Sequence, residues 1–250
     1  MPEIALVSRK GGVGKTTLAV NIAACLANQG GRVLLCDLDP QAAATSHLGV
    51  DYTNLRTVGD LFEGAAEAKD VVVRSRFGVD LIPASPRLAV TEISLLQTPG
   101  GECLLREALQ DIRSEYDWIL VDTPPSLGKL TLNALVAAKW VLIPALAEWA
   151  SVEPVAHTLE AVEAVQRRLN GELRVAGIAM NRVNTRTRSA QLVRERLADL
   201  GVPVMTGTLR ATVRISDALG CQEPILTHDP RHAVCADVLT LTQEVVSIAG

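Results

Sequence analysis

Lys10-Gly11-Gly12-Val13-Gly14-Lys15-Thr16-Thr17 is the stretch that decides the fold of this chain. It follows a short apolar run, Ile4–Val7, and precedes Thr16–Asn28, whose apolar residues recur with the period of a helix. Glycines between a strand and a helix let backbone N–H groups surround an anion, and the helix dipole adds to the attraction. The segment predicts a phosphate-binding loop in which Lys15 reaches the β- and γ-phosphates and the Thr16 hydroxyl binds Mg²⁺.

Further apolar runs of strand length alternate with helical patterns along the rest of the chain. The predicted strands are Val33–Cys36, Val79–Ile82, Trp118–Val121, Val141–Ile143 and Val175–Met180. The predicted helices are Cys103–Arg113, Lys129–Ala137, Val155–Leu169, Ala190–Leu200 and Ala233–Ile248. Strands that are apolar throughout are typical of parallel sheets covered on both faces. We predict an α/β fold with a doubly wound, mostly parallel sheet and helices on both faces, and expect a single domain over residues 1–250.

The composition excludes several classes of protein. Phe, Trp and Tyr make up only 3% of the chain, which argues against nucleic-acid modules that stack bases on aromatic side chains. The five cysteines are scattered and lack C-x-x-C spacing, so we expect buried thiols rather than zinc ligands or disulfides. The first residues lack the features of a signal peptide, which favours a cytoplasmic protein.

Aspartates follow two of the predicted strands. Asp39 comes after Val33–Cys36, and Asp122 directly follows Trp118–Val121. Ligands of open α/β sheets bind at the carboxyl ends of strands, so we predict that Asp39 holds a water that attacks a phosphate. Asp122 is expected to hold Mg²⁺ through a water, and Thr16, Asp39 and Asp122 form the candidate metal site. Asp37 could assist either role, and the alternative for each aspartate is a helix N-cap or a solvated loop carboxylate.

The phosphate-loop motif is a variant of the pattern G-x-x-x-x-G-K-[ST]. Arg9 stands at the first glycine of that pattern, and Lys10 is an added lysine. This variant resembles the deviant Walker A motif of the ParA/MinD group of ATPases. Val33–Gln41, with D-x-D-P-Q, and Trp118–Gly128, a Walker B-like segment, are similar to the same group, and Val213–Ala218 is similar to its ParA/Soj branch. The likeness covers essentially the whole chain.

The resemblance implies an ATPase that uses ATP and Mg²⁺ and forms a homodimer around ATP. It identifies Lys10 as the signature lysine that reaches the nucleotide of the partner subunit, so the candidate catalytic residues are Lys10, Lys15 and Asp39. It also implies that Asn181 contacts adenine, while Arg210 stands where relatives carry proline. The candidate ATP-binding residues are Lys10, Gly11, Gly12, Val13, Gly14, Lys15, Thr16, Thr17, Asn181 and Arg210.

Positive charge is concentrated in one part of an acidic chain. Residues 167–231 hold eleven arginines, no lysine and six acidic residues, a balance of +5, whereas the whole chain carries −4. Arginines can bind phosphate backbones without reading bases, although a solvated helix face is the plain alternative. Arg186 and Arg214 match positions at which ParA/Soj proteins carry basic residues that bind DNA without sequence specificity, so the resemblance implies DNA binding here.

Three functions are compatible with the resemblance. The leading interpretation is a chromosome or plasmid partition ATPase, associated with the nucleoid, whose ATP hydrolysis a ParB-like centromere-binding protein stimulates. The alternative is a MinD-like or other cargo-positioning ATPase, but Leu239–Gly250 contains no Lys or Arg, so we expect no membrane partner. A redox ATPase similar to the nitrogenase iron protein would need cysteines at a dimer face, and the contexts of these five do not suit that role.

Overall fold

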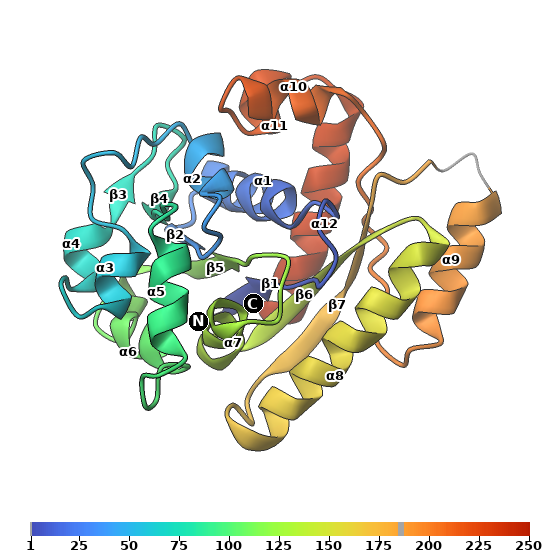
Figure 1. Cartoon of the computed structure of the whole chain (residues 1–250). Coiled ribbons are helices and arrows are strands. Elements are labelled where there is room, and N and C mark those ends of the chain that lie inside the picture. Colours follow the sequence, from blue (N-terminus) through green and yellow to red (C-terminus); the bar gives the residue numbers. More distant parts are fainter. Residues whose placement is uncertain (1, 185–187) are drawn as a thin grey trace.

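A seven-stranded sheet forms the centre of the protein in the computed structural model, which describes residues 2–184 and 188–250 (Figure 1). The strands are ordered β3-β4-β2-β5-β1-β6-β7, and every neighbouring pair is parallel except β3 with β4. Their bounds are β1 (Glu3–Leu6), β2 (Val33–Asp37), β3 (Val73–Arg74), β4 (Asp80–Ile82), β5 (Trp118–Asp122), β6 (Trp140–Leu146) and β7 (Arg174–Asn181). The predicted α/β fold with a mostly parallel sheet is confirmed.

Helices cover both faces of the sheet (Figure 1). One face carries α1 (Lys15–Asn28), α2 (Ala43–His47), α10 (Arg214–Gly220), α11 (Ile225–His228) and α12 (Ala233–Ala249). The other carries α3 (Val58–Phe62), α4 (Ala68–Val71), α5 (Leu88–Leu95), α6 (Leu104–Ala108), α7 (Lys129–Ala137), α8 (Val152–Arg168) and α9 (Arg188–Ala198). Two 3₁₀ turns, η1 (Arg113–Glu115) and η2 (Trp149–Ser151), complete the described elements. No described helix is both long and apolar enough to cross a bilayer.

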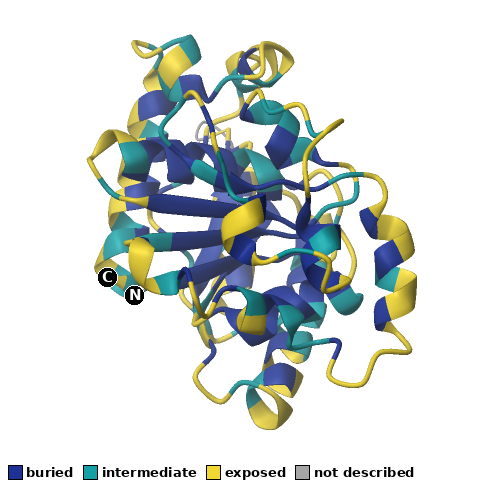
Figure 2. Ribbon diagram, turned by 90° about the vertical axis from the view of Figure 1, so that its left-hand side faces the viewer, coloured by how far each residue is buried: buried dark blue, intermediate teal, exposed yellow. Residues whose placement is uncertain are grey.

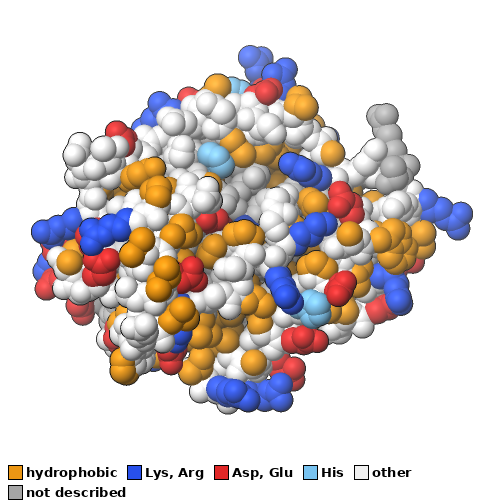
Figure 3. Space-filling model, in the orientation of Figure 1, with side chains coloured by type: hydrophobic (Ala, Val, Ile, Leu, Met, Phe, Trp, Pro, Cys, Tyr) orange, Lys and Arg blue, Asp and Glu red, His pale blue; other side chains and the backbone are white. Residues whose placement is uncertain are grey.

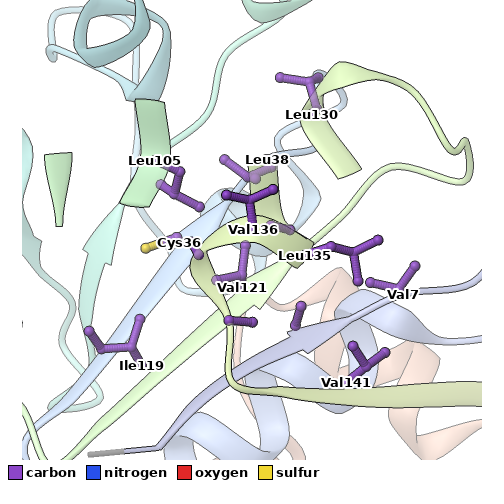
Figure 4. Packing of buried hydrophobic residues seen from close by; sticks show 14 of the residues in the cluster. Val7, Cys36, Leu38, Leu105, Ile119, Val121, Leu130, Leu135, Val136 and Val141 are labelled. Carbon is purple, nitrogen blue, oxygen red and sulfur yellow. The ribbon is translucent and has the colours of Figure 1, made fainter. Parts of the chain in front are cut away.

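Each central strand supplies side chains to two hydrophobic clusters, one on each face of the sheet. In β1, Ala5 belongs to the cluster under α7, whereas Ile4 and Leu6 pack on the α1 side, because successive side chains of a strand point to opposite faces. Figure 2 shows the central strands buried along their length, and Figure 4 shows Cys36 and Val121 packed beneath α7. Burial on both faces explains the uninterrupted apolar runs in the sequence.

Two predictions about the periphery are wrong. The segment Cys103–Arg113 is not one helix, because α6 ends at Ala108 and the chain turns so that Arg113 pairs with the buried carboxylate of Glu3. The cysteines are not all buried either. Cys103 is half-buried and Cys221 is exposed, since the latter directly follows the surface helix α10.

Candidate functional site

A cavity of about 530 Å³ lies at the edge of the sheet where β1, β2 and β7 end. The connection after β1 leads to β2, which lies beyond β5 on one side of β1, whereas β6 pairs with the other side of β1. This change of side opens a crevice at the carboxyl end of β1. Of the predicted site residues, the cavity lining contains Gly12, Gly14, Lys15, Thr16, Thr17, Asp39, Asn181 and Arg210. The fold therefore brings the phosphate loop together with residues from β7 and from the segment that precedes α10.

The loop between β1 and α1 depends on glycine at two positions. Gly12 and Gly14 adopt φ angles of 73° and 93°, in the left-handed region that side chains with a Cβ rarely occupy. Gly14 also lies directly against Asn181, because a Cβ built on it would be 1.9 Å from Asn181 Nδ2. That amide donates a hydrogen bond of 2.9 Å to the Val13 carbonyl, so the end of β7 supports the loop from the side.

Lys15 begins α1, and only 6% of its surface is exposed. Its ammonium donates to the Ser8 carbonyl at 3.4 Å, within the same loop. Burial lowers the pKa of Lys15, while the nearby carboxylates of Asp122 and Asp39 act in the opposite direction. A cation that is held in a low-dielectric crevice attracts an anion more strongly than an exposed lysine does.

Thr16 and Asp122 meet behind the loop. The Thr16 hydroxyl donates a 2.6 Å hydrogen bond to Asp122 Oδ2, across 106 residues of sequence. Asp122 is fully buried, and its Oδ1 atom has no hydrogen-bond partner among the described residues. Burial and the neighbouring Asp37 raise the pKa of Asp122 well above its ordinary value. A buried carboxylate with an unpartnered oxygen beside a hydroxyl is an oxygen donor set that suits a hard cation such as Mg²⁺.

Protein ligands alone do not make a metal cage here. Within residues 2–184 and 188–250, no group of three or more His, Cys, Asp or Glu side chains is placed to hold a metal ion. Mg²⁺ usually takes one or two protein ligands together with waters and substrate phosphates. The donors Thr16 and Asp122, beside a phosphate-binding loop, match that pattern.

The two aspartates that follow the core of β2 have different surroundings. Asp37 is fully buried, and its carboxylate accepts hydrogen bonds from the Thr45 backbone N–H at 2.9 Å and the Thr45 hydroxyl at 2.8 Å. Burial nevertheless raises the pKa of Asp37 to about 6. Asp39 is half-buried in the cavity lining, and its Oδ1 accepts a 2.9 Å bond from the Gln41 N–H. Asp37 therefore holds α2, whereas Asp39 is open to a ligand.

Lys10 points away from its own loop. Its ammonium lies 3.4 Å from Oε2 of Glu148, the residue that precedes η2, and the Lys10 side chain is 26% exposed. The preceding residue, Arg9, is directed to α8, where its guanidinium lies 3.2 Å from His157 Nδ1. Both basic side chains at the start of the loop are thus turned toward the molecular surface beside β6 and α8.

The remaining predicted arginines differ in how far their guanidinium groups are engaged by other residues. Arg210 makes a two-pronged ion pair with Asp237 of α12, with both N–O distances at 2.6 Å. Arg210 also lines the cavity, and its contact with ATP stays a prediction. Arg214 is exposed, and its carboxylate neighbours Asp217 and Asp229 lie at 3.7 and 3.9 Å. Arg186 lies outside the described residues. Arg194, from the same arginine-rich segment, donates to two backbone carbonyls and is structural.

Two cavity residues have no signal in the sequence. Arg182, directly after β7, and His47, at the end of α2, both line the cavity. Neither residue belongs to a recognisable motif, and a lone histidine is usually a surface or capping residue. The folded positions of α2 and of the end of β7 beside the phosphate loop reveal them.

The chain is similar to known proteins over most of its length. A family model described as an AAA domain matches residues 1–175. The chain is 42% identical over 246 residues to the chromosome-partitioning ATPase Soj of Thermus thermophilus, covering 98% of this chain and 95% of that protein. It is 38% identical over 247 residues to the sporulation initiation inhibitor protein Soj of Bacillus subtilis, covering 98% of each. A crystal structure of cobyrinic acid a,c-diamide synthase from Mycobacterium smegmatis with bound ATP analog and magnesium is similar at a TM-score of 0.82, with 35% identity over 89% of this chain and 91% of that one.

Proposed function

This chain belongs to the ParA/Soj family of partition ATPases, and from that membership we propose that it is an ATP-dependent DNA-segregation ATPase. The observation that carries the proposal is the convergence of Lys15, Thr16 and Asp39 on one cavity, with Asp122 buried directly behind Thr16. This set supplies an anion cradle, a cation site and a free carboxylate, which are the parts that phosphoryl transfer needs.

Each residue has a defined task in the proposed hydrolysis. The backbone N–H groups of residues 11–17 and the Lys15 ammonium bind the triphosphate. Asp39 orients the attacking water, because its carboxylate lines the cavity and keeps acceptor capacity beyond the Gln41 N–H. Thr16 and Asp122 hold Mg²⁺, which neutralises charge on the phosphates when bound.

We propose further that ATP joins two copies of the chain through Lys10. The ammonium of Lys10 lies outside the cavity lining and contacts the exposed carboxylate of Glu148, so only a weak pair has to open before Lys10 can reach a phosphate. The expected readout is an ATP-dependent dimer that Lys10→Ala prevents, measured by analytical ultracentrifugation.

DNA binding without sequence specificity is the next step of the proposal. Arg182, Arg188 and Arg214 are exposed, and Figure 3 shows basic side chains over α9 and α10. Dimerisation would place two such surfaces side by side and raise the affinity for a phosphate backbone. A ParB-like partner that stimulates hydrolysis completes the proposed cycle.

The experiment measures binding to random-sequence duplex DNA with ATP, with ADP and without nucleotide, across a series of salt concentrations. The proposal expects binding only with ATP and a steep loss of affinity as salt rises. Arg186→Ala/Arg214→Ala should lose DNA affinity while its ATP hydrolysis stays normal, and Arg74→Ala, which replaces an exposed arginine on the distant edge strand β3, is the matched control. Nucleotide-independent DNA binding would refute the ATP-dependent DNA-segregation role. ATP-dependent binding to anionic vesicles instead of DNA would also refute it and would favour the MinD-like alternative.

A further inference from the structure

The phosphate loop lies between two connections that each carry an exposed apolar side chain. Strand β1 pairs with β5 on one side and with β6 on the other, and all three strands are parallel. The connections that leave β5 and β6 therefore start on the two sides of the loop that follows β1. Leu127, in the connection after β5, is 38% exposed, and Trp149, in the connection after β6, is 54% exposed.

Both connections contact the start of the phosphate loop. On the β6 side, Lys10 Nζ lies 3.4 Å from Glu148 Oε2. On the β5 side, a Cβ built on Gly11 would be 3.7 Å from Pro125 Cβ. The start of the loop is thus in contact with the same two connections that carry the exposed apolar side chains.

The exposed residues around the start of the loop have the composition of a protein interface. Trp149 directly follows Glu148, and Leu127 lies two residues after Pro125, so both apolar side chains are close in sequence to a contact with the loop. Tryptophan is among the residues most enriched at positions that dominate binding energy, whereas glycines of the loop offer no side chain for such a contact. The exposed carboxylate of Glu148 and the ammonium of Lys10 add polar groups beside them, as at the rim of an interface.

The charges of this surface are complementary to those of a second copy. In a dimer with two-fold symmetry the same surface meets its copy, so Lys10 of one copy approaches Glu148 of the other. Exposed charges of this kind select the partner and add little affinity. A stable dimer covers about 800 Å² on each copy and needs an apolar centre. Gly11 and Gly12 are exposed and supply none, so this contact has to come from the residues beside the loop.

We propose that Trp149, with Leu127 on the other side of the loop, anchors the interface with a second copy of this chain when ATP is bound. This inference rests on the proposed function, in which ATP joins two copies through Lys10. Lys10 then makes the dimer depend on nucleotide, and the apolar side chains supply much of the contact energy. Trp149 loses its contact with water when the dimer forms, and keeps it when a nucleotide binds to the monomer.

The first measurement is the dimer dissociation constant with Mg²⁺ and ATPγS, a slowly hydrolysed ATP analogue, from analytical ultracentrifugation of the full chain. Trp149→Ala should raise this constant about thirtyfold or more, the effect of a dominant interface side chain, and Leu127→Ala should raise it by less. Leu169→Ala is the matched control for Leu127→Ala, because Leu169 is equally exposed and lies at the opposite end of α8 from Trp149. Binding of ADP, measured by isothermal titration calorimetry, should be unchanged in each variant.

Tryptophan fluorescence gives an independent readout of the same contact. Trp149 is the most exposed of the three tryptophans, because Trp118 and Trp140 begin β5 and β6 at the opposite edge of the sheet and are half-buried. Quenching by acrylamide should fall when ATPγS is added and stay unchanged with ADP. Trp149→Phe keeps an aromatic ring for the interface, so it should retain most of the dimer affinity while its quenching no longer responds to ATPγS.

Two results would overturn the role of Trp149 alone. One is an unchanged dimer dissociation constant in Trp149→Ala, with or without a loss of DNA binding, and the other is quenching that does not fall although the wild type dimerises. A wild-type protein that binds ATPγS and stays monomeric would instead refute the proposed ATP-dependent dimer, and the inference with it. Thermal unfolding checks the fold of each variant, and the quenching of the wild type and of Trp149→Phe provides the reading if Trp149→Ala unfolds.

Discussion

The ionisation of Asp37 is expected to destabilise the nucleotide-free protein as pH rises. Burial raises the pKa of this carboxyl from 3.8 to about 6, even though Thr45 donates two hydrogen bonds to it. Between these two values the folded protein retains a proton that the unfolded chain has already lost. The free energy of unfolding therefore falls as pH rises through this window, and stays lower above it.

The size of the effect follows from the two pKa values. At 1.36 kcal/mol for each pKa unit, the rise from 3.8 to about 6 corresponds to about 3 kcal/mol. Most of this loss falls between about pH 4 and pH 7. Asp122 acts in the same direction, because burial, and after it the charge of Asp37, raises the pKa of Asp122 as well.

The assay compares urea unfolding of the wild type with that of Asp37→Asn from pH 4 to pH 8, without nucleotide. The asparagine cannot ionise, and the hydrogen bond it loses to Thr45 lowers stability by an amount that does not depend on pH. Surface carboxylates such as Asp117 contribute equally to both proteins and cancel. Relative to the variant, the wild type should lose about 2–3 kcal/mol between pH 4 and pH 7.5. A difference in unfolding free energy that stays flat or grows with pH would refute the assignment of a buried carboxyl with a raised pKa to Asp37.

Three further predictions concern stability and assembly. Asn170→Ala removes an amide that donates to the carbonyls of Leu135, Val136 and Ala138 at the end of α7, so urea unfolding should show a loss of about 1–3 kcal/mol; an unchanged midpoint would contradict this. Gly14→Ala should lower the melting temperature more than Gly64→Ala, because both glycines have positive φ but only Gly14 has a neighbour in the way, and equal shifts would dismiss the close contact with Asn181. Lys10→Ala and Glu148→Ala should each change monomer stability by less than about 1 kcal/mol, since their contact is exposed, and only Lys10→Ala should abolish the ATP-dependent dimer; loss of the dimer in both would assign a direct role to Glu148.

The buried strands were predictable because apolar clusters cover both faces of the sheet. Runs such as Val33–Cys36 and Trp118–Val121 are apolar at every position, and that pattern depends on burial alone. Helix α5 gave no such pattern, because Val90 and Ile93 are 65% and 63% exposed and its apolar residues do not lie on one buried face. Strand β3 has only two residues, too few to show a period.

The residues of the candidate site also fall into two groups, those that a sequence pattern predicts and those that it does not. The phosphate loop is a local motif, and the meeting of Thr16 with Asp122 follows from two strands that end at one edge of the sheet. The contacts of Arg210 with Asp237 and of Lys10 with Glu148 join segments 27 and 138 residues apart. No spacing rule relates such positions, because the folded path of the chain decides which side chains meet. His47 belongs to this second group.

The hydrogen bonds around Thr45 have a mechanical consequence. The hydroxyl oxygen of Thr45 accepts a hydrogen bond from the Ala84 N–H, and the hydroxyl and N–H of Thr45 both donate to Asp37. One residue thereby links β2, α2 and the segment that follows β4. Residues 38–44 lie between Asp37 and Thr45 and form a short segment held at both ends. Asp39 lies near its start, and Ala42, whose backbone is in the left-handed region, lies near its middle. The middle of this segment is held as well, because Ala42 is buried and its N–H donates to the Asp39 carbonyl at 2.8 Å. The backbone that carries the Asp39 carboxylate is therefore fixed to both β2 and α2, so the fold sets the position of this carboxylate before any ligand arrives.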